Sequence, residues 1–237
     1  GPQDDHVLHG EMPCSIINKA WLVIDDNSVT LTGEVEYVKG FGEHYLARPA
    51  VTLYSNNSLF DIQMNVTNLA SVDMPLQYMC HMNYCYEHGS VLSQNIPYSA
   101  ISLRETIPAH VKPTQKWIEF NEMIKEGKYQ LCKLDNDVMY DPEIVFFMDN
   151  LSKYQEQLEY RMESPNGYTY VTKFSSKDFN YATRWILFNE DQQVGAFVLP
   201  ATCRPEGFLA AKEAGSLIML KPKETRTFCV TTGIDNF

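Results

Sequence analysis

The sequence predicts an all-β protein, organised as a large antiparallel β-sandwich with few short helices. Apolar and polar residues alternate over several short segments, which is typical of half-buried strands. Turn-forming residues separate these segments, and helical spacing is largely confined to one stretch. Roughly ten to fifteen short strands joined by turns favour a sandwich, and a sandwich of this length is often one domain. We therefore expect a single domain over residues 1–237.

The first strands are indicated by strict alternation. Between Val29 and Tyr37, apolar residues alternate with threonine and glutamate, and the pattern continues at Val51 and Leu53. The polar residues 55–58 predict a hairpin turn into a strand over Leu59–Asn68. A second polar turn then leads into an apolar strand that ends at His81.

The later strands are shorter and are separated by clear turns. Pro165, Asn166 and Gly167 predict a hairpin between two of them. Helical spacing of Trp117, Phe120 and Ile124 predicts a helix. The expected elements are strands at 144–148, 156–163, 168–174, 184–188, 193–199 and 225–232, a helix at 114–126 and a helical turn at 210–214.

Charge and cysteine usage exclude several classes of function. The net charge is −11, from 19 basic and 30 acidic residues, which argues against binding to nucleic acid or to anionic membranes. No apolar run approaches the length needed to span a membrane. The six cysteines form no Cys-x-x-Cys pair, so free thiols in a reducing compartment are expected. We therefore expect a cytoplasmic protein.

His81 is the first candidate for chemistry. It stands at the end of a predicted strand, close to Asn83, Tyr84 and Tyr86. A titratable imidazole among hydrogen-bonding side chains can donate or accept a proton for a small ligand, although a core histidine bonded to a backbone carbonyl would have the same sequence context. With Cys85 and His88 it forms a His-x₃-Cys-x₂-His pattern, but no fourth zinc ligand is apparent. No metal and no cofactor are predicted.

Four motifs in order carry a resemblance to a known family. They are Leu8-His9-Gly10, Val66-Thr67-Asn68-Leu69, His81-Met82-Asn83-Tyr84 and the segment 197–207. Together they resemble the galactose mutarotase (aldose 1-epimerase) superfamily, and in particular a bacterial branch of aldose-epimerase-like proteins. The resemblance implies the supersandwich fold of that superfamily. It also implies that some N-terminal strands of the family are missing before His9.

The resemblance implies roles for several side chains. His81 would be the acid that protonates the ring oxygen of a sugar, and His9 would bind sugar hydroxyls. Glu143 matches an acidic position that accepts two adjacent hydroxyls, although a solvated carboxylate at a strand start is an equal reading. Lys173 and Arg184 would contribute polar ligand contacts, with Trp185 beside Arg184 as an aromatic platform. Both are also common as structural residues.

The base of the family's reaction is the main departure. The family carries its catalytic glutamate at a strand end, and Pro200 occupies that position here. Glu206 follows closely in the sequence. It could act as the base by a different approach, or it could be a surface residue of the Pro-Glu-Gly turn.

The resemblance therefore predicts a carbohydrate isomerase, most simply an aldose 1-epimerase acting on a free or modified monosaccharide. One alternative is a non-catalytic sugar-binding or regulatory module, which the proline at position 200 favours. Another is a different carbohydrate-active enzyme, such as a lyase or an epimerase at another carbon. An unpaired sheet edge left by the missing strands would favour a homodimer.

Overall fold

The structure, a computed structural model, describes residues 9–108 and 110–235. The chain divides into two compact units. Unit 1 contains the described residues up to 78 together with 205–232, and unit 2 contains 79–204 together with 233–235. The expectation of a single domain remains a prediction, and the two units are described separately below.

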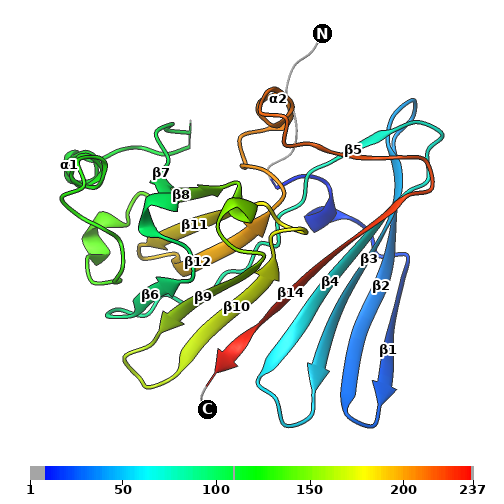
Figure 1. Ribbon diagram of the computed structural model, residues 1–237, viewed down its shortest axis with the longest axis horizontal. Coiled ribbons are helices and arrows are strands. Elements are labelled where there is room, and N and C mark those ends of the chain that lie inside the picture. Colours follow the sequence, from blue (N-terminus) through cyan, green and yellow to red (C-terminus); the bar gives the residue numbers. More distant parts are fainter. Residues whose placement is uncertain (1–8, 109, 236–237) are drawn as a thin grey trace. The chain divides into compact units, whose positions relative to one another are not determined.

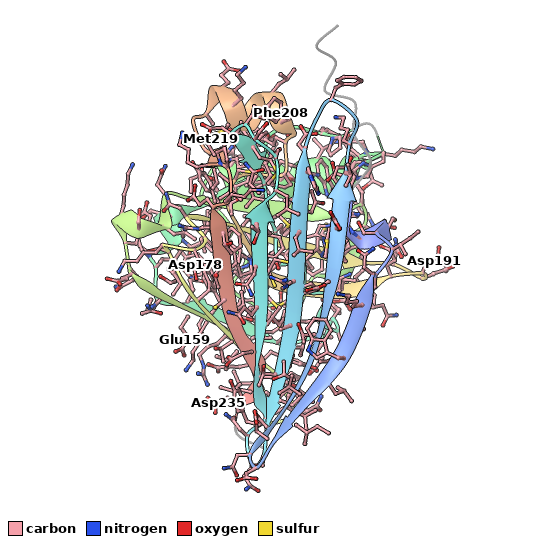
Figure 2. The ribbon with its side chains drawn as sticks, turned by 90° about the vertical axis from the view of Figure 1, so that its right-hand side faces the viewer. Glu159, Asp178, Asp191, Phe208, Met219 and Asp235 are labelled. Carbon is pink, nitrogen blue, oxygen red and sulfur yellow. The ribbon has the colours of Figure 1, made fainter. Side chains whose placement is uncertain are left out.

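Unit 1 is built on a sheet of long antiparallel strands (Figures 1 and 2). Their order in the sheet is β1-β2-β3-β4-β14. The bounds are β1 (Lys19–Asp25), β2 (Ser28–Val38), β3 (His44–Tyr54), β4 (Leu59–Asn68) and β14 (Thr225–Asp235). A short ladder of β5 (Met74–Leu76) and β13 (Ile218–Leu220), the helix α2 (Phe208–Glu213) and the 3-10 turn η1 (Met12–Cys14) complete the unit.

Alternation along these strands separates a polar from an apolar face, as the sequence predicts for β2 and β4. On the polar face, the hydroxyls of Thr30 and Thr52 are hydrogen-bonded at 2.8 Å across β2 and β3. On the other face, Leu31 lies opposite Val51, and Val51 lies opposite Ile62. Cross-strand apolar pairs of this kind are the unit of sheet stabilisation.

Unit 2 contains two antiparallel sheets. One has the order β10-β9-β6 and the other β12-β11-β8-β7. The bounds are β6 (Val91–Gln94), β7 (Ile101–Leu103), β8 (Ile144–Asp149), β9 (Gln157–Glu163), β10 (Thr169–Ser175), β11 (Tyr181–Phe188) and β12 (Gln193–Ala201). The helix α1 (Gln115–Lys125) and the 3-10 turns η2 (Tyr98–Ala100), η3 (Asp137–Met139) and η4 (Leu151–Lys153) connect them.

The core of unit 2 lies between its two sheets. Tyr160 of β9 and Phe197 of β12 are fully buried. A methyl group added at Gly195 of β12 would meet the sulfur of Met162 in β9 at 3.4 Å, so the sheets approach closely there. Together with the antiparallel pairing throughout, this confirms the predicted all-β fold class.

The predicted helix at 114–126 is confirmed as α1. The hydroxyl of Thr114 accepts a hydrogen bond from the backbone N–H of Trp117 at 3.2 Å and so caps the N-terminus of the helix. Trp117 and Phe120 are buried, as their spacing predicts. Among the described residues, no helix is long and apolar enough to cross a membrane.

The predicted strand that ends at His81 does not form as a regular strand. Regular pairing stops at Leu76, and residues 79–86 instead run along the free edge of β12. Met79 bridges to Ala201, and the N–H of Cys80 donates to the carbonyl of Pro200 at 2.9 Å. Because Pro200 has no N–H to return, a regular ladder cannot form at this point.

Candidate functional site

His81 lies in unit 2, on the segment that follows the edge of β12. Its side chain is exposed, and its ring meets the ring of Trp185 edge-on, with 5.8 Å between centroids and 67° between planes. Trp185 belongs to β11, the strand next to β12. The imidazole is therefore held against a side chain of the sheet while it remains accessible to solvent.

Trp185 connects this histidine to Glu143. In the β8–β11 pairing Trp185 lies opposite Val145, and Glu143 precedes Val145 by two residues, so all three share one face. The indole N–H of Trp185 donates to Oε2 of Glu143 at 2.6 Å. The sequence does not link these residues, which lie 42 positions apart.

Arg104 and His110 complete the surroundings of Glu143. Nη2 of Arg104 lies 3.0 Å from Oε1 of Glu143, and Nε2 of His110 lies 3.5 Å from the same oxygen. The side chains of Arg104 and Glu143 are only 12% and 15% exposed, so solvent screens this pair less than a surface pair. We call the five side chains His81, Arg104, His110, Glu143 and Trp185 the Trp185 cluster.

Local structure explains why Glu143 is held in place. It immediately precedes β8, whose first five residues are buried. Its backbone carbonyl accepts a hydrogen bond from the indole N–H of Trp117 in α1 at 3.2 Å. The backbone N–H of Arg104 donates to the carbonyl of Val145 at 2.8 Å, which extends the pairing of β7 with β8. Helix and sheet thus fix both partners of the ion pair.

A small cavity of about 70 Å³ adjoins the cluster. Arg104 and Trp117 line it together with polar residues of α1, among them Asn121 and Lys125. It has room for a few waters or a small substituent of a ligand.

A second ion pair occupies the same face of the β12-β11-β8-β7 sheet. Phe147 and Asp149 follow Val145 at alternate positions of β8, so they share its face. Arg204 donates from Nε and Nη2 to the carboxylate of Asp149, at 3.0 and 2.5 Å. Its guanidinium lies 4.7 Å from the centre of the Phe147 ring. The sheet therefore presents two arginine–carboxylate pairs on one face.

Arg184 lies on the opposite face of β11 from Trp185 and is 1% exposed. Its guanidinium donates to the carbonyls of Phe197 and Leu131 at 3.0 and 3.3 Å, and to Oε1 of Gln94 at 2.9 Å. Burial lowers the pKa of this side chain. A role in joining the two sheets fits this position better than contact with a ligand.

Lys173 lies on β10 of the other sheet. Its Nζ is 3.4 Å from Oε2 of Glu159, which also pairs with Arg161. Arg161 in turn contacts Asp235 at 3.1 Å; Figure 2 labels Glu159 and Asp235. The structure therefore places Lys173 in a network of partly exposed ion pairs and not in the Trp185 cluster.

The other two predicted residues lie in unit 1. His9 is exposed and has a left-handed backbone with φ of 67°, followed by Gly10 with φ of 75°. Glu206 is exposed in the turn before α2. Pro200 is buried in β12 opposite Ala182, so this strand position carries no acid or base.

Sequence reasoning missed Arg104 and His110. Arg104 follows a strand of only three residues, which is too short to give a periodic signal, and His110 lies in a loop. Across residues 9–108 and 110–235, no three or more His, Cys, Asp or Glu side chains gather as they would around a metal ion. His88 of the His-x₃-Cys-x₂-His pattern pairs with Asp137 at 2.9 Å.

Several solved structures share the fold. A candidate aldose 1-epimerase from Klebsiella pneumoniae superimposes with a TM-score of 0.70 at 15% identity, over 91% of this chain and 53% of that protein. A candidate aldose 1-epimerase from Escherichia coli K12 gives 0.58 at 18% identity, over 93% and 69%. A galactose mutarotase-like protein from Lactobacillus casei gives 0.58 at 13% identity, over 93% and 73%. The chain thus has the galactose mutarotase-like β-sandwich fold and spans about half of the Klebsiella protein.

The comparisons with known sequences found one matching family. The comparison with curated proteins found no match. A family model described as a domain of unknown function, DUF4432, matches residues 2–234. Because that match covers nearly the whole sequence, the chain belongs to the DUF4432 family.

Proposed function

We propose that this protein is a carbohydrate isomerase, most simply an aldose 1-epimerase that acts on a free or modified monosaccharide without a cofactor. The observation that carries the proposal is the Trp185 cluster, in which one aromatic side chain contacts both His81 and Glu143. An imidazole, a carboxylate and an indole surface form a suitable set for a sugar ring and its hydroxyls. The shared fold with candidate aldose 1-epimerases supports the same function.

The reaction interconverts the two anomers of an aldose through its open chain. In our proposal His81 gives a proton to the ring oxygen while a base takes the proton of the anomeric hydroxyl. The ring opens, C1 rotates about the C1–C2 bond, and the ring closes on the other face. Each of the two proton transfers contributes about 10²- to 10⁴-fold to the rate.

Glu143 and Glu206 receive different roles. Glu143 already accepts hydrogen bonds from Trp185 and Arg104, which suits a carboxylate that orients two hydroxyls more than one that removes a proton. Glu206 is exposed and remains the proposed base. His9 is proposed to bind sugar hydroxyls.

The cell compartment is part of the same proposal. All six cysteines lie within the described residues and are free thiols. This supports a reducing compartment, and we propose the cytoplasm.

Saturation-transfer NMR or polarimetry on a panel of aldoses tests the activity. We expect faster anomer exchange for at least one sugar, and about a 10²- to 10⁴-fold slower rate for His81→Asn. Glu206→Gln should lower kcat by a similar factor, whereas Glu143→Gln should mainly raise KM. His88→Asn is the matched control, because His88 lies shortly after the same segment but pairs with Asp137. If no sugar responds, the proposal is wrong.

A non-catalytic sugar-binding module is the second candidate. The buried Pro200 in place of the family's glutamate favours it. In that case calorimetry would detect binding of a monosaccharide that shows no accelerated anomer exchange. Loss of turnover in Glu206→Gln would exclude this alternative.

A further inference from the structure

Strand β1 forms an exposed edge of the unit 1 sheet (Figure 1). All seven of its residues are exposed, and the four central side chains, Trp21 to Ile24, are between 40% and 72% exposed. Within residues 9–108 and 110–235, only β2 pairs with β1. An apolar edge strand of this length is a template for pairing with another strand.

The hairpin geometry shows which backbone groups point outward. Asp25 pairs with Ser28 around the two-residue turn Asp26-Asn27. In such a hairpin the closing pair exchanges both hydrogen bonds, and the next residue along the strand directs its N–H and C=O to the other side. Ala20, Leu22 and Ile24 therefore direct their backbone groups to the unpaired edge.

We propose that β1 pairs antiparallel with β1 of a second copy, across a two-fold axis at Leu22. In this register the outward-directed residues meet each other, with Leu22 opposite the partner's Leu22 and Ala20 opposite the partner's Ile24. Both pairs can exchange two hydrogen bonds, as the antiparallel ladder requires.

The side chains of β1 are complementary in the same register. The strand begins with Lys19 and ends with Asp25. Antiparallel pairing about Leu22 sets Lys19 opposite the partner's Asp25, and the two-fold axis repeats this contact at the other end. Trp21 lies opposite the partner's Val23, an aromatic and β-branched pair of the kind that stabilises sheets.

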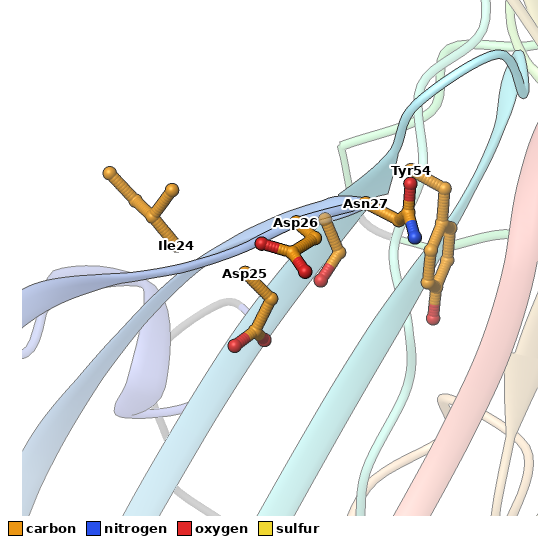
Figure 3. Close-up of a pocket in the computed structure, with 6 residues that line it drawn as sticks. Ile24, Asp25, Asp26, Asn27 and Tyr54 are labelled. Atoms are coloured by element: carbon orange, nitrogen blue, oxygen red, sulfur yellow. The ribbon is translucent and has the colours of Figure 1, made fainter.

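The surface at the end of β1 is suited to receive a lysine. A shallow hollow of about 460 Å³ is lined there by Ile24, Asp25, Asp26, Asn27, Ser28 and Tyr54. Figure 3 shows the carboxylates of Asp25 and Asp26 beside each other in it. Lys19 is 73% exposed, and its Nζ lies 3.5 Å from Glu34, so its ammonium group stays at the surface and can turn toward a partner.

The charges of β1 itself point to a second copy as the partner. A different protein would need an edge strand with a base and an acid six positions apart, whereas β1 supplies both. Every favourable contact away from the two-fold axis is also made twice, because the interface is symmetric.

Charge reversal tests the register in the full chain. Sedimentation equilibrium should show a concentration-dependent dimer for the wild-type protein. Lys19→Asp alone or Asp25→Lys alone sets like charges opposite each other at both ends of the interface, and should weaken dimerisation by about tenfold or more. The double variant K19D/D25K restores opposite charges at both ends, so it should recover most of the wild-type affinity.

The controls are the same changes at the exposed pair Lys39 and Glu43, which lies in the β2–β3 turn of the same unit. Lys39→Asp and Glu43→Lys should leave the dimer unchanged. A monomer across the concentration range would overturn the proposal. So would a dimer that the double variant does not rescue, because the strands would then meet in another register or through another surface.

Discussion

Trp185 is the residue on which the candidate site depends. Its indole N–H binds one oxygen of Glu143, while its ring makes an edge-on contact with the imidazole of His81. A rigid aromatic side chain can hold two functional groups at a fixed separation at little entropic cost. In the proposed reaction it is a positioning residue for His81 and Glu143.

The strength of the Trp185 contact can be measured against a second tryptophan. Trp185→Phe removes a hydrogen bond to a charged carboxylate, which contributes about 1.5–3 kcal/mol to stability. Trp117→Phe removes a hydrogen bond to the backbone carbonyl of Glu143, and such a bond contributes about 0.5–1.5 kcal/mol. Urea unfolding should therefore show a larger loss of unfolding free energy for Trp185→Phe. Equal losses would mean that the carboxylate is not anchored through the indole.

Arg184 and Trp185 are consecutive residues of β11, yet their side chains have different surroundings. In a strand, successive side chains point to opposite faces. Arg184 enters the core between the sheets of unit 2, whereas Trp185 points to the cluster. The arginine that shares Glu143 with Trp185 is instead Arg104, from a strand end far away in the sequence.

At the scale of elements, the carboxylate of Glu87 joins the β9–β10 hairpin to the segment that follows His81. Glu87 accepts hydrogen bonds from the hydroxyls of Ser164, Tyr168 and Tyr170. Burial by itself raises the pKa of Glu87, but these hydrogen bonds outweigh it and lower the pKa below its usual value. The folded state therefore favours the ionised carboxylate.

This arrangement predicts a dependence of stability on pH. Because the folded pKa of Glu87 is lowered, its contribution is fully present above the ordinary value near 4.5 and is lost as the pH falls through the folded pKa. Glu87→Gln should lower the urea midpoint clearly at pH 7 and much less near pH 3. Glu163→Gln, an exposed change at the end of β9, is the control and should have little effect at either pH. If Glu87→Gln lowered the urea midpoint by the same amount at pH 7 and near pH 3, the prediction would be contradicted.

Two elements were not predictable from local pattern. The sequence of β1 does not alternate because both of its faces are exposed and apolar. The segment 79–86 is apolar enough to suggest a strand, but its pairing partner contains Pro200, and only isolated bridges form. In both cases the pairing with the neighbouring strand determines the local structure, and a local sequence pattern does not show that pairing.

At the scale of the whole molecule, the chain consists of two compact units whose sheets are antiparallel. His81 and Glu143 belong to unit 2, and His9 and Glu206 belong to unit 1. The proposed function requires that the folded protein binds a sugar. A bound sugar should stabilise the folded chain against unfolding.

Thermal unfolding with a panel of free and modified aldoses tests this expectation. A ligand present at about 100 times its Kd adds about 2.7 kcal/mol to the folded state. For a chain of this length that raises Tm by about 5 to 10 °C. A sugar alcohol, which has no anomeric centre, is the control and should give little shift. Absence of a shift with every aldose would contradict sugar binding, whether catalytic or not.

The sequence by itself determined the fold class, the strands with clean alternation and the helix α1, and it offered His81 and Glu143 as candidates. These depend on local periodicity and on short motifs, which are readable within a few residues. Tertiary structure alone decided that Arg104, His110 and Trp185 surround Glu143 and that Arg184 is buried. It also decided that, within residues 9–108 and 110–235, β1 pairs with β2 alone. The reason is that strand pairing joins residues tens of positions apart, and the partner strand determines which side chains meet and which edge stays exposed.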